Sequence, residues 1–181
     1  MSRAGTWLLA AAVLAAGMLA THAETEWPVE RGFAHHGAVG EELVVQPGTV
    51  VVHGARAAAA YSDGYDGTLA SDGVWVAVDV TLTGGREPVD ISTWSLRDGA
   101  GRRYLVSDRA LPGSFGAVQP GSPVRGEVVF EVPRDALGDV EIWVNHGIDE
   151  PRLADYAVVP VHVERLAHEP MTAEPPALVP R

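Results

Sequence analysis

The stretch Val74–Thr83, which reads V-W-V-A-V-D-V-T-L-T, decides the fold class of this chain. Branched aliphatic residues occupy every second position, namely Val74, Val76, Val78, Val80 and Leu82. A period of two places alternate side chains on opposite faces of a β-strand. One face of this strand is therefore wholly aliphatic and must be covered by other parts of the protein. We expect it to be the central strand of a β-sandwich.

Several shorter segments on both sides of this stretch also have the composition of strands. They are Glu42–Val45, Thr49–Gly54, Val89–Leu96, Arg103–Val106, Val124–Val132, Val140–Asn145 and Val158–Glu164. Glycine and proline turns separate them, and no long helical period intervenes. About seven to eight short strands of this kind predict an all-β fold, an immunoglobulin-like antiparallel β-sandwich. A small barrel is the alternative that the same pattern permits.

Two neighbouring segments of the chain give a weaker signal. Arg56–Tyr61 contains a run of alanines that periodicity does not assign to any element. Residues 62–73 carry several Asp-Gly pairs, which are typical of turns, so we expect a long loop there.

The composition excludes several classes of function. A formal net charge of −11, with 13 basic residues against 24 acidic ones, argues against binding to nucleic acid or to an anionic membrane surface. The chain contains no cysteine, which excludes disulfides, thiolate metal sites and a cysteine nucleophile. A length of 181 residues corresponds to one domain with tails.

The two ends of the chain differ in character from its body. Residues 1–23 combine Arg3, an apolar run and small residues before Glu24, which is the pattern of a secretory signal peptide. An uncleaved anchor that contacts the membrane through residues 4–20 is the alternative, and either reading places the protein outside the cytoplasm. A polar lead-in over residues 24–39 then precedes the sandwich at residues 40–166. The proline-rich residues 167–181 are expected to be a disordered tail.

The order of motifs in the body resembles that of a known family. The relevant motifs are the central strand itself, P-V-D-I-S at Pro88–Ser92, L-R-D-G-A-G-R-R-Y at Leu96–Tyr104, Q-P-G at Gln119–Gly121 and G-E-V-V-F-E-V-P at Gly126–Pro133. Together they resemble secreted immunoglobulin-like domains of unknown function from Gram-positive bacteria and actinobacteria, relatives of the mycobacterial immunoprotective extracellular protein. The resemblance covers roughly Gly40–Val144. It implies an extracellular sandwich that serves as a secreted or cell-surface interaction module, and it implies no catalytic residues.

No catalytic constellation stands out in the sequence. There is no G-x-S-x-G nucleophile elbow between a strand and a helix, and the histidines are scattered along the chain. We therefore expect a protein that is not an enzyme and has no cofactor.

Histidines and loop carboxylates suggest a possible metal site. His146 and His162 would approach each other if their strands were neighbours, and Asp63 and Asp66 offer oxygen ligands in a loop. Their spacing fits no EF-hand loop, and solvent-facing histidines with ordinary Asp-Gly turns are the alternative.

Two tryptophans offer a candidate binding surface. Trp75 and Trp143 stand at the outward-facing positions of well-alternating strands, where polar residues are usual. Aromatic residues of this kind are enriched at interface hot spots. The alternative is that the alanine run or the lead-in covers them as a second layer of core.

The sequence as a whole predicts a non-enzymatic extracytoplasmic interaction module that binds an unknown protein or a cell-envelope component. An acidic surface would favour a basic partner. The alternative function is that of an extracytoplasmic accessory protein that binds a metal or a small ligand.

Overall fold

The computed structural model describes residues 13–14, 17, 32–62, 67–91, 93–110, 114–146, 154–164 and 169–180. The chain divides into two units, Met1–Arg31 and Gly32–Arg181. In the first unit, Val13, Leu14 and Gly17 are helical, and the rest of the expected signal or anchor segment lies outside the described residues. Within the described part of the chain, no helix has both the length and the apolar character needed to cross a membrane.

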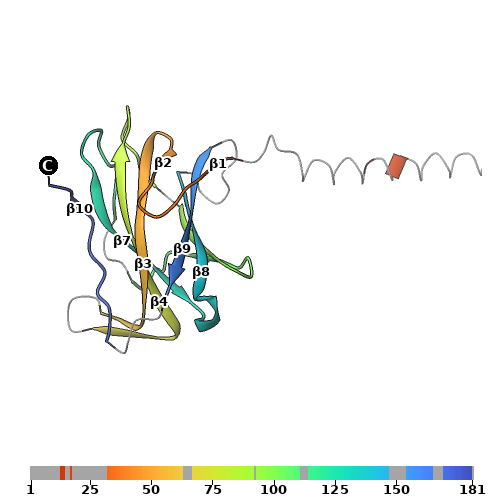
Figure 1. Cartoon of the computed structure of the whole chain (residues 1–181), viewed down its shortest axis with the longest axis vertical. Helices are drawn as coiled ribbons and strands as arrows, with labels where there is room; N and C mark the ends of the chain where they lie inside the picture. The colour runs from red at the N-terminus through yellow and green to blue at the C-terminus, as the bar shows by residue number, and fades with distance from the viewer. Residues whose placement is uncertain are drawn as a thin grey trace, which may run out of the picture. The chain divides into compact units, whose positions relative to one another are not determined.

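In the second unit, the described residues form two five-stranded sheets that face each other (Figure 1). Sheet A has the strand order β1 (Phe33–His36), β9 (Asp155–Val163), β8 (Gly138–Asn145), β5 (Thr93–Asp98) and β6 (Arg103–Leu105). Sheet B has the order β10 (Ala177–Leu178), β7 (Val124–Val132), β4 (Thr68–Gly84), β3 (Gly48–Ser62) and β2 (Glu42–Val45). A short 3₁₀ helix, Arg134–Ala136, precedes β8. The predicted β-sandwich is confirmed, with more strands than expected.

The aliphatic face of β4 forms the centre of the core. Val74, Val76, Val78 and Val80 are fully buried, as the alternation predicts. Strand β4 pairs with β3 on one side and with β7 on the other. Buried residues of sheet A close the core from the opposite layer, among them Leu96, Ile142, Val144 and Val159. Two sheets packed face to face place such side chains in a layer about 10 Å thick.

The hairpin formed by β3 and β4 is longer than the sequence indicated. The alanine run continues β3, where Ala57 pairs with Val76 and Ala58 with Trp75. Strand β4 begins at Thr68, so the expected loop over residues 62–73 is wrong at its second half. The pairing register shifts beyond Ala58, and residues 71–74 stand opposite the single residue 59. Alanine is somewhat depleted in strands, so its place in a sheet depends on the neighbours that it packs against.

Gly73 marks the point where this irregular segment approaches β7. A Cβ atom at this position would lie 2.1 Å from the carbonyl oxygen of Val132, so a side chain has no room there. The Asp-Gly pair that suggested a loop instead allows two backbones to pass closely.

The lead-in over residues 24–39 is not a loop throughout. Residues 33–36 form β1, which runs parallel to β9 and is the one parallel pairing among the described strands. His35 Nε2 lies 2.8 Å from Asp155 Oδ1, which ties the two strands together. The four-residue strand forms because β9 offers a sheet edge, and that edge is invisible in a local sequence pattern.

The expectation of a disordered tail over residues 167–181 is also contradicted, over its described residues 169–180. Residues 169–180 lie against sheet B, with β10 paired to β7 and Met171 paired to Tyr61 (Figure 1). Met171 and Ala173 are each only 4% exposed. Proline removes a backbone donor, but it is compatible with an extended segment at a sheet edge. Composition alone therefore misjudged this segment.

Candidate functional site

Trp143 lies at the centre of the outer face of sheet A. It stands on β8 between Ser95 of β5 and Val158 of β9. Its ring stacks on that of Tyr156, with centroids 5.0 Å apart and an interplanar angle of 16°. The guanidinium carbon of Arg97 lies 3.8 Å from the Trp143 ring centroid. We call these three residues, Arg97, Trp143 and Tyr156, the aromatic cluster.

Contacts within this face hold the indole in place while leaving it partly exposed. Trp143 Nε1 donates a hydrogen bond to Glu141 Oε2 at 2.9 Å. The cation–π contact of Arg97 contributes about 0.5–1 kcal/mol at a site of this exposure. Trp143, Tyr156 and Arg97 are each half-buried. The Nε atom of Arg97 is buried and has no hydrogen-bond partner among the described residues. The cluster thus presents a rigid aromatic edge beside an arginine.

Trp75 is buried, although the alternation in the sequence places it, like Trp143, on the outer face of its sheet. It is fully buried on the outer face of sheet B, in a small second core with Tyr61, Val129 and Met171. Its Nε1 donates to the carbonyl of Leu69 at 3.1 Å. The prediction that Trp75 forms an exposed binding surface is therefore wrong.

The alternative of a covered tryptophan is correct for Trp75, and the alanine run supplies part of the cover through Ala58 and Tyr61, whereas the C-terminal segment was not predicted to contribute. The residues that cover it include Met171 and Ala173 of the C-terminal segment, with Ala110 from the loop after β6. Met171 and Ala173 alternate with the polar residues Thr172 and Glu174. That period-two pattern is the one signal in the sequence that could have identified the cover.

The histidines proposed as metal ligands do not come together. His162 lies opposite Asp139 near the start of β8, whereas His146 follows Asn145 at the end of that strand. The six residue steps from Asp139 to Asn145 span roughly 20 Å of strand. His146 Nδ1 donates to the carbonyl of Asp90, and His162 Nδ1 lies 2.7 Å from Asp139 Oδ1.

The predicted carboxylate ligands Asp63 and Asp66 lie outside the described residues. Within the described ranges, no group of three histidines or carboxylates could hold a metal ion. The geometry therefore gives the metal-binding alternative no support from His146 and His162.

Asp98 is the most deeply buried carboxylate of sheet A, and its surroundings are those of a structural anchor. It accepts hydrogen bonds from Arg102 Nε at 2.6 Å and from the Tyr104 hydroxyl at 3.0 Å. The backbone amides of Ala100 and Arg102 also donate to it. Burial raises the pKa of Asp98, but these hydrogen bonds outweigh burial and hold the pKa below its ordinary value. Because the carboxylate is saturated with donors, it fixes the predicted hairpin and is a poor candidate for acid–base catalysis.

An open groove lies beside Gly73, and its charges are mostly paired. Arg109 lines it and makes two hydrogen bonds to Glu131, at 2.7 and 2.9 Å, and one to the carbonyl of Ala70. Arg134 and Asp135 complete one wall. Both hydrogen bonds to Glu131 come from Arg109 Nη1, and Nη2 donates to Ala70, so both terminal nitrogens of the guanidinium already have acceptors.

No family model and no curated protein sequence matches this chain. Two solved structures are similar to it. The yjhA protein from Bacillus subtilis has a TM-score of 0.48 and 13% identity, over 67% of this chain and 98% of its own. An uncharacterized β-sandwich protein from Clostridium difficile 630 has a TM-score of 0.46 and 10% identity, over 72% of this chain and 96% of its own. Neither similarity is close enough to carry an argument about what this chain does, and the resemblance to actinobacterial relatives stays a prediction.

Proposed function

We propose that this protein is a non-enzymatic extracytoplasmic interaction module with an immunoglobulin-like sandwich, and that it binds a protein or envelope component through the outer face of sheet A. The strand order supports the finer fold assignment. Strands β3, β4 and β7 share one sheet, while β6, β5, β8 and β9 share the other. The chain crosses between sheets from β4 to β5 and again from β7 to β8, as an immunoglobulin fold does between B and C and between E and F.

The difference between the two outer faces carries the proposal. On sheet B, Trp75 and its neighbours are capped by the chain's own C-terminal segment. On sheet A, the aromatic cluster stays half-exposed and is held by contacts from three different strands. A rigid, partly exposed aromatic residue loses little conformational entropy when it binds, and such residues dominate the energy of many interfaces.

The signal-like residues 1–23 and the acidic composition support the location and the mode of encounter. Removal of residues 1–23 takes away Arg3 and no acidic residue, so the net charge would change from −11 to −12. A charge of this size steers basic partners and makes association sensitive to salt.

The test is a pull-down from the producing cell's envelope with residues 24–181 as bait, at low and moderate salt. Trp143→Ala should weaken capture of a stoichiometric partner by about 30-fold or more, because a hot-spot aromatic contributes about 2 kcal/mol or more. Phe33→Ala is the matched control, because Phe33 is an exposed aromatic outside the cluster. Equal capture by the Trp143→Ala, Phe33→Ala and parent proteins would refute this binding face.

A further inference from the structure

Residues 169–180, which we call the strap, lie on sheet B in the manner of a bound peptide. Met171 and Ala173 are buried in the small core that contains Trp75, while Thr172 and Glu174 between and after them are exposed. An extended peptide that places alternate side chains into pockets, with main-chain hydrogen bonds to a sheet, is a recurring mode of peptide recognition.

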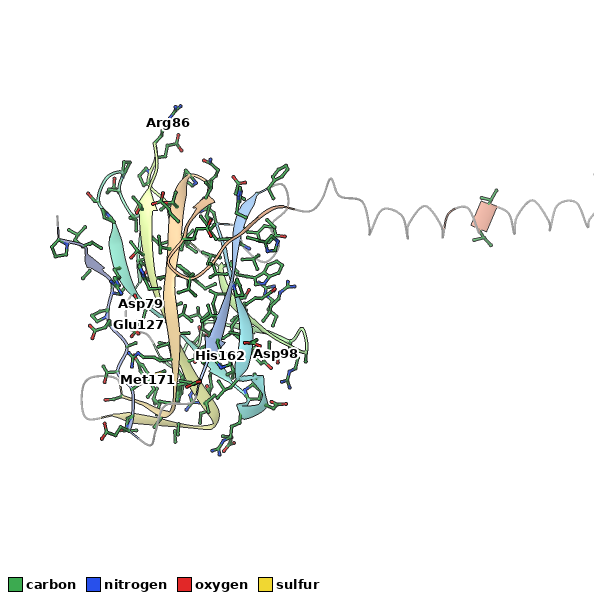
Figure 2. The ribbon with its side chains drawn as sticks, viewed as in Figure 1. Asp79, Arg86, Asp98, Glu127, His162 and Met171 are labelled. Atoms are coloured by element: carbon green, nitrogen blue, oxygen red, sulfur yellow. The ribbon has the colours of Figure 1, made fainter. Side chains whose placement is uncertain are left out.

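Main-chain hydrogen bonds fix the strap at both of its ends. They are Met171 N to Ala60 O at 3.0 Å, Ser62 N to Met171 O at 2.8 Å, Glu127 N to Glu174 O at 2.9 Å and Val179 N to Pro123 O at 2.9 Å. The first two join the strap to the end of β3, and the last two join it to β7 and the residue before it. The strap therefore runs from the β3–β4 hairpin to the edge of the sheet at β7 (Figures 1 and 2).

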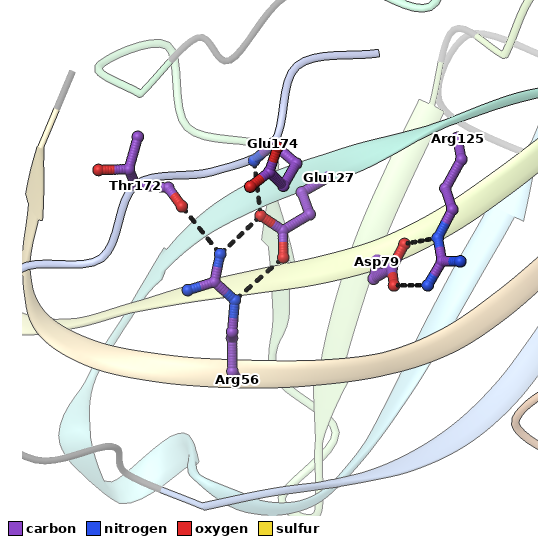
Figure 3. A network of polar contacts seen from close by, with 6 residues as sticks. All are labelled: Arg56, Asp79, Arg125, Glu127, Thr172 and Glu174. Carbon is purple, nitrogen blue, oxygen red and sulfur yellow. Dashed lines mark hydrogen bonds and ion pairs between the residues drawn. The ribbon is translucent and has the colours of Figure 1, made fainter. Parts of the chain in front are cut away.

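An ion pair between the half-buried Arg56 and the buried Glu127 holds the middle of the strap (Figure 3). Arg56 of β3 makes two hydrogen bonds to Glu127 of β7, at 3.0 and 2.7 Å, and Glu127 is only 5% exposed. Arg56 Nη2 also donates to the carbonyl of Thr172 at 2.8 Å, and Glu174 N donates to Glu127 Oε2 at 2.8 Å. The body thus supplies a charged pair whose remaining hydrogen bonds are completed by backbone atoms of the strap.

The strands of sheet B therefore hold a preformed site for an extended peptide. The side-chain partners, Arg56 and Glu127, come from strands that the sandwich itself positions. Without a strap, Glu127 would lose a donor, the second core would be exposed and β7 would have an open edge between residues 124 and 127. An exposed apolar patch beside an unpaired strand edge recruits another extended segment.

The surface of sheet B that lies under the strap, with Trp75, Arg56 and Glu127, is the groove referred to below. We propose that this groove is a peptide-binding site that accepts the strap of a second copy of the chain, so that two copies exchange straps and form a dimer. The proposal concerns sheet B and is independent of the face proposed above for an envelope partner. The M-T-A-E segment is the ligand that the groove demonstrably fits, and a strap from another copy would make the same contacts. Exchange of an identical element is a low-cost route to dimers. The strap of the same copy competes, so exchange should grow with protein concentration.

The first experiment measures peptide binding to a chain whose own strap is disabled. Residues 24–181 carrying Met171→Asp are titrated by calorimetry with a synthetic peptide of residues 169–180. We expect saturable one-to-one binding, and at least tenfold weaker binding of the same peptide carrying Met171→Asp. No binding of either peptide, or equal binding of both, would overturn the groove as a peptide site.

The second experiment tests the second copy as the occupant. The Met171→Asp chain, which keeps its groove, is mixed with an Arg56→Met chain, which keeps its strap, and native mass spectrometry counts the complexes. We expect a one-to-one complex in the mixture and only monomers of each variant alone at the same concentration.

Arg125→Met is the matched control for Arg56→Met. Arg125 makes a bidentate pair with Asp79 beside the groove, and its side chain makes no hydrogen bond to the strap (Figure 3). In a mixture with Met171→Asp chains it should form far less complex, because its own groove retains its strap. If the peptide binds but the Arg56→Met mixture stays monomeric, the second copy is overturned as occupant. The peptide measurement does not involve Arg56→Met and therefore stands if that variant fails to fold.

Discussion

A buried carboxylate stays charged only where donors replace the water that it has lost, and Asp98 shows this at the scale of one residue. Four donors reach its two oxygens, and all of them come from the hairpin that follows β5. Its neighbour Arg102 also contacts Asp135, which links the hairpin to the 3₁₀ helix before β8. The turn signal in D-G-A-G was visible in the sequence, but the role of Asp98 as the anchor depends on where the chain places Tyr104.

The lowered pKa of Asp98 predicts acid sensitivity. Because the folded-state pKa lies below the unfolded value of about 3.9, the stabilisation is complete above pH ~4 and is lost as the pH falls through the folded-state value. Asp98→Asn should lower the melting temperature at pH 7 and flatten its decline below pH 4. Thermal melts from pH 2 to pH 7 measure both effects. Parallel melting curves for the two proteins across that range would contradict the prediction.

The pKa of His162 should lie above the ordinary value for histidine, whereas loss of water alone would lower it. Its hydrogen bond to Asp139 and the nearby Glu164 raise its pKa above the ordinary value. The associated stabilisation is present below pH ~6.5 and fades as the pH rises through the raised folded-state pKa. An NMR titration of the imidazole should show a pKa above 6.5 that falls in Asp139→Asn. An unchanged His162 titration in the variant would disprove the pairing.

At the scale of elements, β4 is the strand whose loss would remove the core. Val78 is fully buried and pairs with Ala55 on one side and Val128 on the other. Val78→Ala should reduce the free energy of unfolding by about 2 kcal/mol, from lost burial and the cavity that remains. Val78→Asp should prevent folding altogether, because it places an unpaired charge in the core.

Urea denaturation measures the Val78→Ala effect. Val44→Ala on β2 is the control, because Val44 is 38% exposed and its loss should change stability by less than about 0.5 kcal/mol. Equal midpoints for the two variants would mean that the aliphatic face of β4 is not the centre of the core.

Strong alternation predicted elements well, and weak alternation did not. Strand β7 matches the predicted Val124–Val132, because its pattern is long and both its ends are marked by turns. The alanine run and residues 33–36 of the lead-in became strands only because a neighbouring edge was available, and a local pattern holds no record of that edge. Their assignment depends on tertiary pairing.

The two outward tryptophans show the same limit for the candidate site. The period of two correctly placed Trp75 and Trp143 on outer faces. It could not tell which face would be covered, because part of the cover of Trp75 is Met171, almost a hundred residues later in the chain. Alternation therefore predicts the face on which a side chain lies, whereas exposure is a property of the whole molecule.

At the scale of the whole molecule, the strap completes the protection of sheet B. The edge of β7 is covered by the strap from residues 124 to 127 and by Val106 and Ser107 near Val129 and Phe130. An uncovered edge of this length is a template for unwanted pairing between chains. The sandwich and its C-terminal segment therefore form one folding unit, and the domain extends beyond the expected boundary at residue 166.

A truncated chain of residues 24–168 should therefore be less stable than residues 24–181 by about 2 kcal/mol or more. Burial of Met171 contributes about 1.5–3 kcal/mol, and leaving the buried Glu127 short of a donor costs about 1–3 kcal/mol, against which the regained freedom of the strap counts. Urea denaturation measures the loss in the free energy of unfolding. Tryptophan emission should shift to longer wavelength as the Trp75 indole becomes exposed to solvent. Leu178→Ala, at a residue 69% exposed in the intact strap, should leave both observables unchanged. A disordered tail would instead give the truncated chain the same midpoint and the same emission as the full one, because its removal would uncover no apolar surface and break no hydrogen bond.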